Sequence, residues 1–314
     1  MDFMKPKLYI LSIIVLLCSS CSKDSTGQQE SVQVNFATKI EMPTKVGEYF
    51  EAGEKLGLFG YNYIQGEDIM APDYMYNVAL EHTGDRKWST QETYYWSPNT
   101  IKWKRFYAYY PFAENGTSEN IVGLSPADHT GAPYVDFTFT DAKTDFMVCE
   151  GVDGNVENPV IQFTAKHALA KLSIGFATDI ENGYAYAKAL KVNGITKIGR
   201  YEYSKGAFTF DAAPETVDFE LTQPKNEDGT DKEIIADSKE AVYVDEYTMY
   251  LLPNAVASIE TVINGVPQTF DLSRVPLASG KNTGIRIIID QKGASFKVSI
   301  GDWETGGSVN GTID

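Results

Sequence analysis

Cysteine and histidine are the side chains of this sequence best suited to covalent and acid–base chemistry, and the chain has three of each. His82, His129 and His167 are scattered, and no serine-hydrolase elbow, phosphate-binding loop or His-Glu-x-x-His motif accompanies them. His167 lies next to the start of an apolar run, where we expect a packed or hydrogen-bonded histidine. The sequence therefore predicts no enzymatic activity, no cofactor and no metal centre.

Two further features have chemical potential, and each has a simpler explanation. Cys149 follows Phe146-Met147-Val148, so we expect a buried structural thiol rather than a nucleophile. The acidic segment 226–233 offers oxygen ligands of the kind that Ca²⁺ binds, but its spacing departs from the EF-hand pattern. A solvated loop is the simpler interpretation. Carboxylates are plentiful elsewhere, and nothing in the sequence selects a catalytic pair.

The strongest chemical signal lies at Cys21. Lys5 and Lys7 precede an uncharged, mostly apolar stretch, 8–18, which is far shorter than the roughly 20 residues of a transmembrane helix and suits a signal peptide. Ser19, Ser20 and Cys21 then resemble a bacterial lipobox, although Cys18 stands where leucine is usual. The resemblance implies cleavage before Cys21 and a lipid on its thiol. The alternative is an ordinary signal peptide with an incidental cysteine.

Composition narrows the class of protein. The chain has 314 residues, a length that suits two domains, and 43% of them are hydrophobic, enough for real cores. A formal net charge of −16 argues against nucleic acid as a partner. The 19 tyrosines and 16 phenylalanines favour β structure.

The elements expected from periodicity are mostly strands. Residues 32–36 and 134–139 alternate apolar and polar side chains, whereas 56–59 and 106–110 are continuously apolar and indicate strands covered on both faces. Segment 169–176 begins the second half, after a boundary near 160–168. Further strands are expected at 207–210, 217–221, 247–252, 258–263, 285–289 and 296–300. Ala185–Leu190 is expected as a short helix. The pattern predicts an all-β chain of antiparallel sandwiches, with domains over 31–165 and 166–314 after the signal segment 1–21 and a polar tether 22–30.

Nine pieces of the sequence, in order along the chain, carry a resemblance to a known family. They are the lipobox, Val34-Asn35-Phe36, 50–59 (FEAGEKLGLF), 106–112 (FYAYYPF), 145–149 (DFMVC), 163–172 (FTAKHALAKL), 249–253 (MYLLP) with 277–281 (LASGK), and Asp302-Trp303-Glu304. On these pieces the chain resembles the fimbrillin-like proteins of Bacteroidales, subunits of type V pili made as lipoprotein precursors. The resemblance implies two tandem transthyretin-like antiparallel β-sandwich domains.

The resemblance also implies a route of assembly. The outer-membrane lipoprotein reaches the cell surface, a trypsin-like or arginine-specific protease removes its first strand, and a strand of another fimbrial subunit fills the groove. The removable strand is expected at Ser31–Ala37, with Val32, Val34 and Phe36 facing the core. The cut is expected after Lys39 or Lys45, where the family often has arginine.

Other expectations concern partners and modification. The donated strand is expected from 296–300 or 308–314, and host or bacterial surface receptors are candidate partners. Ser25 lies in Asp24-Ser25-Thr26, which resembles an O-glycosylation site of Bacteroidota. One alternative is a surface glycan-binding lipoprotein that stacks sugars on aromatic residues such as Tyr94-Tyr95-Trp96 and Trp103. Such clusters more often belong to the core or edge of a sandwich, which is the simpler interpretation. Another alternative is an anchor or minor fimbrial subunit that is never processed.

Overall fold

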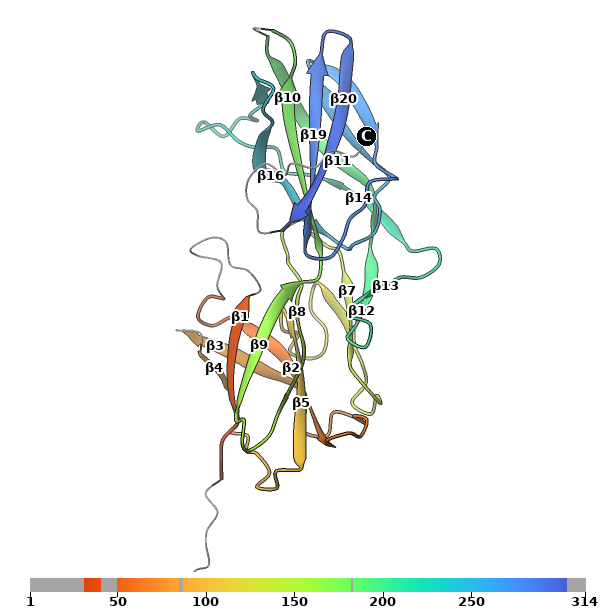
Figure 1. The fold of residues 1–314 in the computed structure, drawn as a ribbon. Helices are drawn as coiled ribbons and strands as arrows, with labels where there is room; N and C mark the ends of the chain where they lie inside the picture. Colours follow the sequence, from red (N-terminus) through yellow and green to blue (C-terminus); the bar gives the residue numbers. More distant parts are fainter. Residues whose placement is uncertain (1–30, 41–49, 85–86, 182, 304–314) are drawn as a thin grey trace, which may run out of the picture. The chain divides into compact units, whose positions relative to one another are not determined.

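Strands are the regular elements of the computed structural model, which describes residues 31–40, 50–84, 87–181 and 183–303. No helix within these ranges is long and apolar enough to cross a membrane. The all-β prediction is therefore confirmed for the described part of the chain. The strands form a closed barrel, a small sheet beside it and two further sheets that face each other (Figure 1).

The barrel is built from the first half of the chain. Its strands, in the order in which they are hydrogen-bonded, are β1 (Asn35–Ile40), β4 (Lys87–Thr90), β3 (Met75–Gly84), β2 (Lys55–Ile64), β5 (Lys102–Tyr110), β8 (Met147–Gly154) and β9 (Val160–His167). Most neighbours are antiparallel, but β1 closes the barrel by pairing in parallel with β9. Figure 1 shows the orange-red β1 beside the green β9.

A second sheet covers one side of this barrel. Its strands, in order, are β13 (Ala207–Thr209), β12 (Ile198–Glu202), β7 (Tyr134–Thr138) and β6 (Ile121–Leu124). Leu58 and Phe106 belong to the core inside the barrel, whereas Phe59 and Tyr107 pack in a separate core that includes residues of the covering sheet. The prediction that 56–59 and 106–110 are strands buried on both faces is confirmed.

The hairpin β12–β13 comes from the second half of the sequence and pairs with β7 of the first half. Tyr201, Tyr203 and Phe208 complete the aromatic core over the barrel. The two halves are thus interlocked across residue 165. The division into domains at 165 and 166 stays a prediction.

The remaining strands form two sheets around an aliphatic core. One sheet runs β16 (Val242–Leu251), β10 (Ala170–Thr178), β19 (Lys281–Asp290) and β20 (Gly293–Asp302). The other runs β14 (Thr216–Glu220), β11 (Ala185–Thr196), β17 (Ser258–Ile263) and β18 (Val266–Asp271), with β15 (Ile234–Ala236) also paired to β11. The core between them includes Leu172, Ile174, Val192, Ile259 and Ile287.

The short helix expected at Ala185–Leu190 is wrong, because these residues are the first half of β11. Their alanines, lysine and leucine favour a helix locally. Pairing with β15 on one side and β17 on the other overrides that preference. Ala189 has a φ of 55° at a register shift in the ladder, which marks a bulge in the strand.

Candidate functional site: the seat of the first strand

The first strand, β1, lies in a gap between β4 and β9, two strands that are distant in sequence. We call this gap the seat of β1. Asn35–Ile40 pair in parallel with Val160–Ala165 of β9, and Phe36 and Ala37 pair with Trp88 and Lys87 of β4. Just before the strand, Val34 N donates to Tyr94 O at 2.9 Å and Trp96 N donates to Val32 O at 2.9 Å. Removing this segment would leave unpaired backbone groups on both sides of the gap. Such edges are what an incoming strand recognises.

Alternate side chains of the strand enter the barrel core. Val34, Phe36 and Thr38 are buried, and Val32 packs partly buried against the same core. The Phe36 ring lies parallel to Phe163, with centroids 6.2 Å apart, and edge-on to Phe106 at 5.4 Å. The inward orientation expected for Val34 and Phe36 is therefore present, and the ordered strand extends beyond the expected end at Ala37 to Ile40.

A buried hydrogen bond adds a specific requirement to this seat. Trp88 Nε1 donates to Thr38 Oγ1 at 2.7 Å, and both side chains are buried. If Thr38 left with its strand, the indole N–H would lose its partner, which costs about 1–3 kcal/mol unless another acceptor replaces it. A replacing strand that places a hydrogen-bond acceptor at the position of Thr38 should therefore bind better than one that does not. Sequence analysis missed this pair because the two residues lie 50 positions apart.

Only some of the other residues expected to take part in processing and strand exchange lie within the described ranges. Lys39 lies within the strand, where its backbone pairs with Thr164. Cys21, Ser25 and Lys45 lie outside the described residues, as does the tail segment 308–314. The alternative donor segment 296–300 lies in β20, at the edge of its sheet and paired along its length with β19.

His82, His167 and Cys149 have packing roles. The His167 ring stacks on Trp303 at 4.2 Å and 4°, and His167 Nδ1 lies 2.6 Å from Asp145 Oδ2. This confirms the expectation of a packed, hydrogen-bonded histidine. Cys149 is 1% exposed, and burial raises the pKa of its thiol, which opposes reactivity. His82 is buried beside Trp88.

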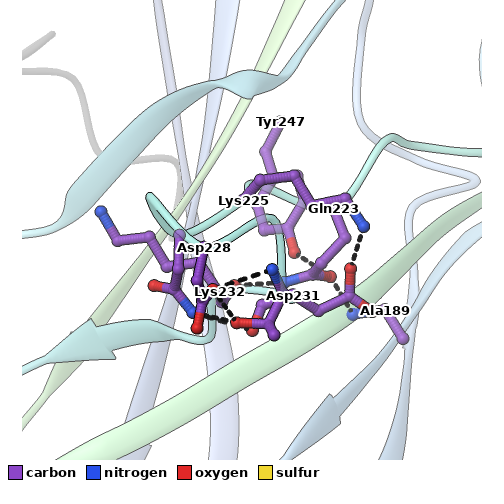
Figure 2. A network of polar contacts seen from close by, with 9 residues as sticks. Ala189, Gln223, Lys225, Asp228, Asp231, Lys232 and Tyr247 are labelled. Atoms are coloured by element: carbon purple, nitrogen blue, oxygen red, sulfur yellow. Dashed lines mark hydrogen bonds and ion pairs between the residues drawn. The ribbon is translucent and has the colours of Figure 1, made fainter.

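The acidic loop is held by its own hydrogen bonds. Figure 2 shows Gln223 at its base, where Gln223 Oε1 accepts from Ala189 N and Tyr247 Oη, each at 2.8 Å. Asp228 Oδ1 accepts from the Thr230 amide at 3.0 Å, and Lys225 pairs with Asp231. Within the described ranges, no group of three or more His, Cys, Asp or Glu side chains is placed to hold a metal.

The aromatic residues considered for sugar stacking differ in exposure. Trp96 is 4% exposed, packs edge-on to Phe106 and donates from Nε1 to Pro159 O at 3.1 Å. Its neighbour Tyr95 is exposed, whereas Trp103 is partly covered. The core position favoured for such aromatic residues is therefore confirmed for Trp96, whose indole packs in the barrel core near β1.

Comparison with known proteins gives a consistent result. A family model described as fimbrillin-like matches residues 44–303. The fold is similar to that of a fimbrial protein from Bacteroides vulgatus, with a TM-score of 0.66, 18% identity, and coverage of 86% of this chain and 99% of that one. It is also similar to a candidate cell adhesion protein from Bacteroides uniformis, with a TM-score of 0.56, 16% identity, and coverage of 87% and 99%. No curated protein matches the chain by sequence.

Proposed function

The chain belongs to the fimbrillin-like family, which makes it a fimbrial subunit, and from that premise we propose that it assembles by exchange of its first strand. The observation that carries this proposal is the position of β1. It closes the barrel at a parallel seam with β9, inserts Phe36 between aromatic rings, and is the most N-terminal strand described. A terminal strand held between two separate strands can be replaced without rethreading the rest of the chain.

The N-terminal segment would deliver the precursor to the outer membrane. Lipid on Cys21 would anchor it, and the polar tether 22–30 would separate the folded part from the bilayer. More than one acyl chain gives stable anchoring, which suits a precursor waiting at the surface. O-glycosylation of Ser25 would fall within this tether. Cleavage behind β1 would release lipid, tether and strand together.

Of the two candidate cuts, we favour the one after Lys45. Lys39 is engaged in the β1–β9 ladder opposite Thr164, and a protease needs an extended backbone that is free of such pairing. Cleavage after Lys45 would leave Val46 as the new N-terminus, whereas cleavage after Lys39 would leave Ile40.

The donated strand must match the empty seat. It would pair with Val160–Ala165 and with β4, present an apolar side chain in place of Phe36, and offer an acceptor to Trp88 in place of Thr38. Segment 308–314 is one candidate. Segment 296–300 would first have to leave β19. Surface receptors remain candidate partners of the assembled fibre.

We also propose that each half is a transthyretin-like sandwich domain. The two facing sheets of the second half and the covering sheet over the barrel support this proposal. The hairpin β12–β13 would then be a tie between tandem domains.

Limited trypsin digestion of the full-length chain tests strand exchange. We expect loss of the segment that ends at Lys45, followed by oligomers that resist SDS without boiling. Lys45→Gln should block both effects, and Lys39→Gln is the matched control that should leave them intact. A clean cut that yields only a stable monomer would contradict the proposal. An unprocessed anchor subunit would instead resist digestion at both lysines.

A further inference from the structure

A buried lysine lies at the start of β5 and faces the end of β2. Lys104 is 5% exposed, and its strand neighbour two positions on, Phe106, is fully buried in the barrel core. The residue directly opposite Lys104 in the antiparallel ladder is Asn62. Lysine is almost never this buried unless it is paired. Among the ion pairs of the described residues, none includes Lys104.

The partners of Lys104 form a compact polar group under an aromatic ring. Lys104 Nζ lies 2.6 Å from Asn62 Oδ1 and 3.4 Å from the centroid of the Tyr74 ring. Asp73 accepts from Asn62 twice, through Oδ1 from the backbone N–H at 2.9 Å and through Oδ2 from Nδ2 at 3.2 Å. An amine, a carboxamide and a carboxylate are therefore held together, with the carboxylate at the amide nitrogen.

We propose that Lys104 and Asn62 form an intramolecular isopeptide bond, with Asp73 carrying the proton, so that β2 and β5 become covalently joined. The Nζ–Oδ1 distance places Nζ at most about 3.8 Å from Asn62 Cγ, since a carbonyl bond is about 1.2 Å long. Reacting atoms in a near-attack arrangement lie about 3–3.5 Å apart. A small side-chain rotation is enough to reach it.

The environment supplies the reactive form of the amine. Burial lowers the pKa of Lys104 to about 8, and the nearby Asp73 charge only partly opposes this. About one Lys104 side chain in ten is then neutral at pH 7, against fewer than one in a thousand at the ordinary lysine pKa. A desolvated, neutral lysine is an activated nucleophile.

The reaction balances without any other reagent. The Nζ lone pair attacks Cγ and moves the carbonyl electrons onto Oδ1. The attacking nitrogen gives a proton to the Asp73 carboxylate, which passes it to Nδ2. The C–Nδ2 bond then breaks, ammonia leaves, and the carbonyl re-forms in a Lys104 Nζ–Asn62 Cγ amide. A remaining Nζ proton stays on the new secondary amide.

The bond would lie where it reinforces the barrel most. In the order of the strands, β2 and β5 are the pair farthest from β1. If β1 were removed, these two would be the central strands of the opened sheet. The cross-link would hold that centre while the edges at β4 and β9 accept a new strand. Its formation does not depend on strand exchange, so the two proposals can fail separately.

Peptide mapping of the full-length chain by mass spectrometry tests the bond directly. After denaturation and digestion, we expect a branched peptide that joins the Asn62 and Lys104 segments and has lost one ammonia. Unmodified Asn62 and Lys104 in separate linear peptides would overturn the proposal. A linear peptide that has lost ammonia at Asn62 would indicate a succinimide and would overturn it equally.

Variants separate the roles of the three residues. Asp73→Asn keeps both reacting groups and should abolish the branched peptide. Lys104→Arg should abolish it and leave Asn62 intact. Lys102→Arg, on the same strand with an exposed side chain, is the matched control and should retain it. A branched peptide that persists in Asp73→Asn would overturn the assigned role of Asp73.

Discussion

β1 is the first strand of the barrel, and β10 is the first strand of the two facing sheets around the aliphatic core, here called the sandwich. The two strands have the same kinds of neighbours but are paired with them over different lengths. Each lies between one antiparallel and one parallel neighbour. β10 pairs with β19 from Lys171 to Thr178 and with β16 from Ala170 to Phe176. β1 pairs with β9 over six residues, Asn35–Ile40, but with β4 only at Phe36 and Ala37.

Continuity of the chain adds to this difference. β10 follows directly from β9 and cannot leave without disrupting the barrel. β1 is the first strand described, and besides its ladders it is held by Phe36 among aromatic rings and by Thr38 on Trp88. The same arrangement of neighbours is therefore more extensively paired around β10 than around β1, and under the proposed strand exchange only β1 is replaced.

Substitutions of buried phenylalanines give the largest expected effect and test the comparison directly. Phe36→Ala should lower the free energy of unfolding of the precursor by about 3–5 kcal/mol, because it leaves a cavity beside Phe106 and Phe163. Assembled fibres that have lost β1 should be unaffected. Phe163→Ala, in the wall of the seat, should weaken the precursor and the fibre alike. Denaturant unfolding measures the stability of the precursor, and fibre dissociation measures the stability of the fibre.

The matched control lies in the sandwich. Phe176→Ala in β10 also removes a buried ring and should cost a similar free energy of unfolding. It should leave the rate at which trypsin releases the first strand unchanged, whereas Phe36→Ala should accelerate release. If both variants accelerated the release of the first strand equally, the proposed difference between β1 and β10 would be contradicted.

An intermediate effect is expected at the buried hydrogen bond. Thr38→Val keeps the shape of the side chain but leaves Trp88 Nε1 without an acceptor, which should cost about 1–3 kcal/mol in thermal or urea unfolding. The counterpart Thr178→Val in β10 removes a donor to Ile289 O and an acceptor for Ile180 N, each at 3.2 Å, and should cost a similar free energy because it also leaves an N–H without its partner. A loss of stability at Thr178 with none at Thr38 would contradict the role assigned to the hydrogen bond of Trp88.

The smallest effect is expected at Tyr247, beneath the acidic loop. Tyr247→Phe removes the hydrogen bond to Gln223 and should cost about 1 kcal/mol at neutral pH. Burial raises the pKa of Tyr247 from 10.0 to about 12. Its protonated form therefore stabilises the fold fully below about pH 10, and this contribution is lost as pH rises towards 12. Stability curves of the two proteins should converge across that window.

Sequence reasoning succeeded where the pattern along a strand determined the outcome. Alternate burial of Val34 and Phe36, and two-sided burial around Phe59 and Tyr107, follow from which positions are apolar. It failed at Ala185–Leu190, where a local helix preference gave way to partners far along the chain. The core position favoured for Trp96 is confirmed, but its partners Pro159 and Phe106 lie elsewhere in the chain and have no signal beside Trp96.

The parallel seam and the Lys104–Asn62 pair had no local signal strong enough to find them. The partners of β1 in β9 lie more than a hundred residues away, and no pattern within 35–40 names them. Lys104 did leave one trace. It occupies an inward position in a strand whose next inward residues are Phe106 and Ala108. A charged residue that alternates with buried apolar residues on the inward face of a strand is therefore a sequence signal for a buried polar group of this kind.

The N-terminus of the chain in fibres isolated from cells is the most direct test of the central claim. If β1 is replaced during assembly, sequencing of the fibre-bound chain should begin at Val46, or at Ile40 if Lys39 is cut. The lipid on Cys21 should then be found only on chains that are not in fibres. Fibre-bound chains that begin at Cys21 and retain Phe36 would contradict strand exchange.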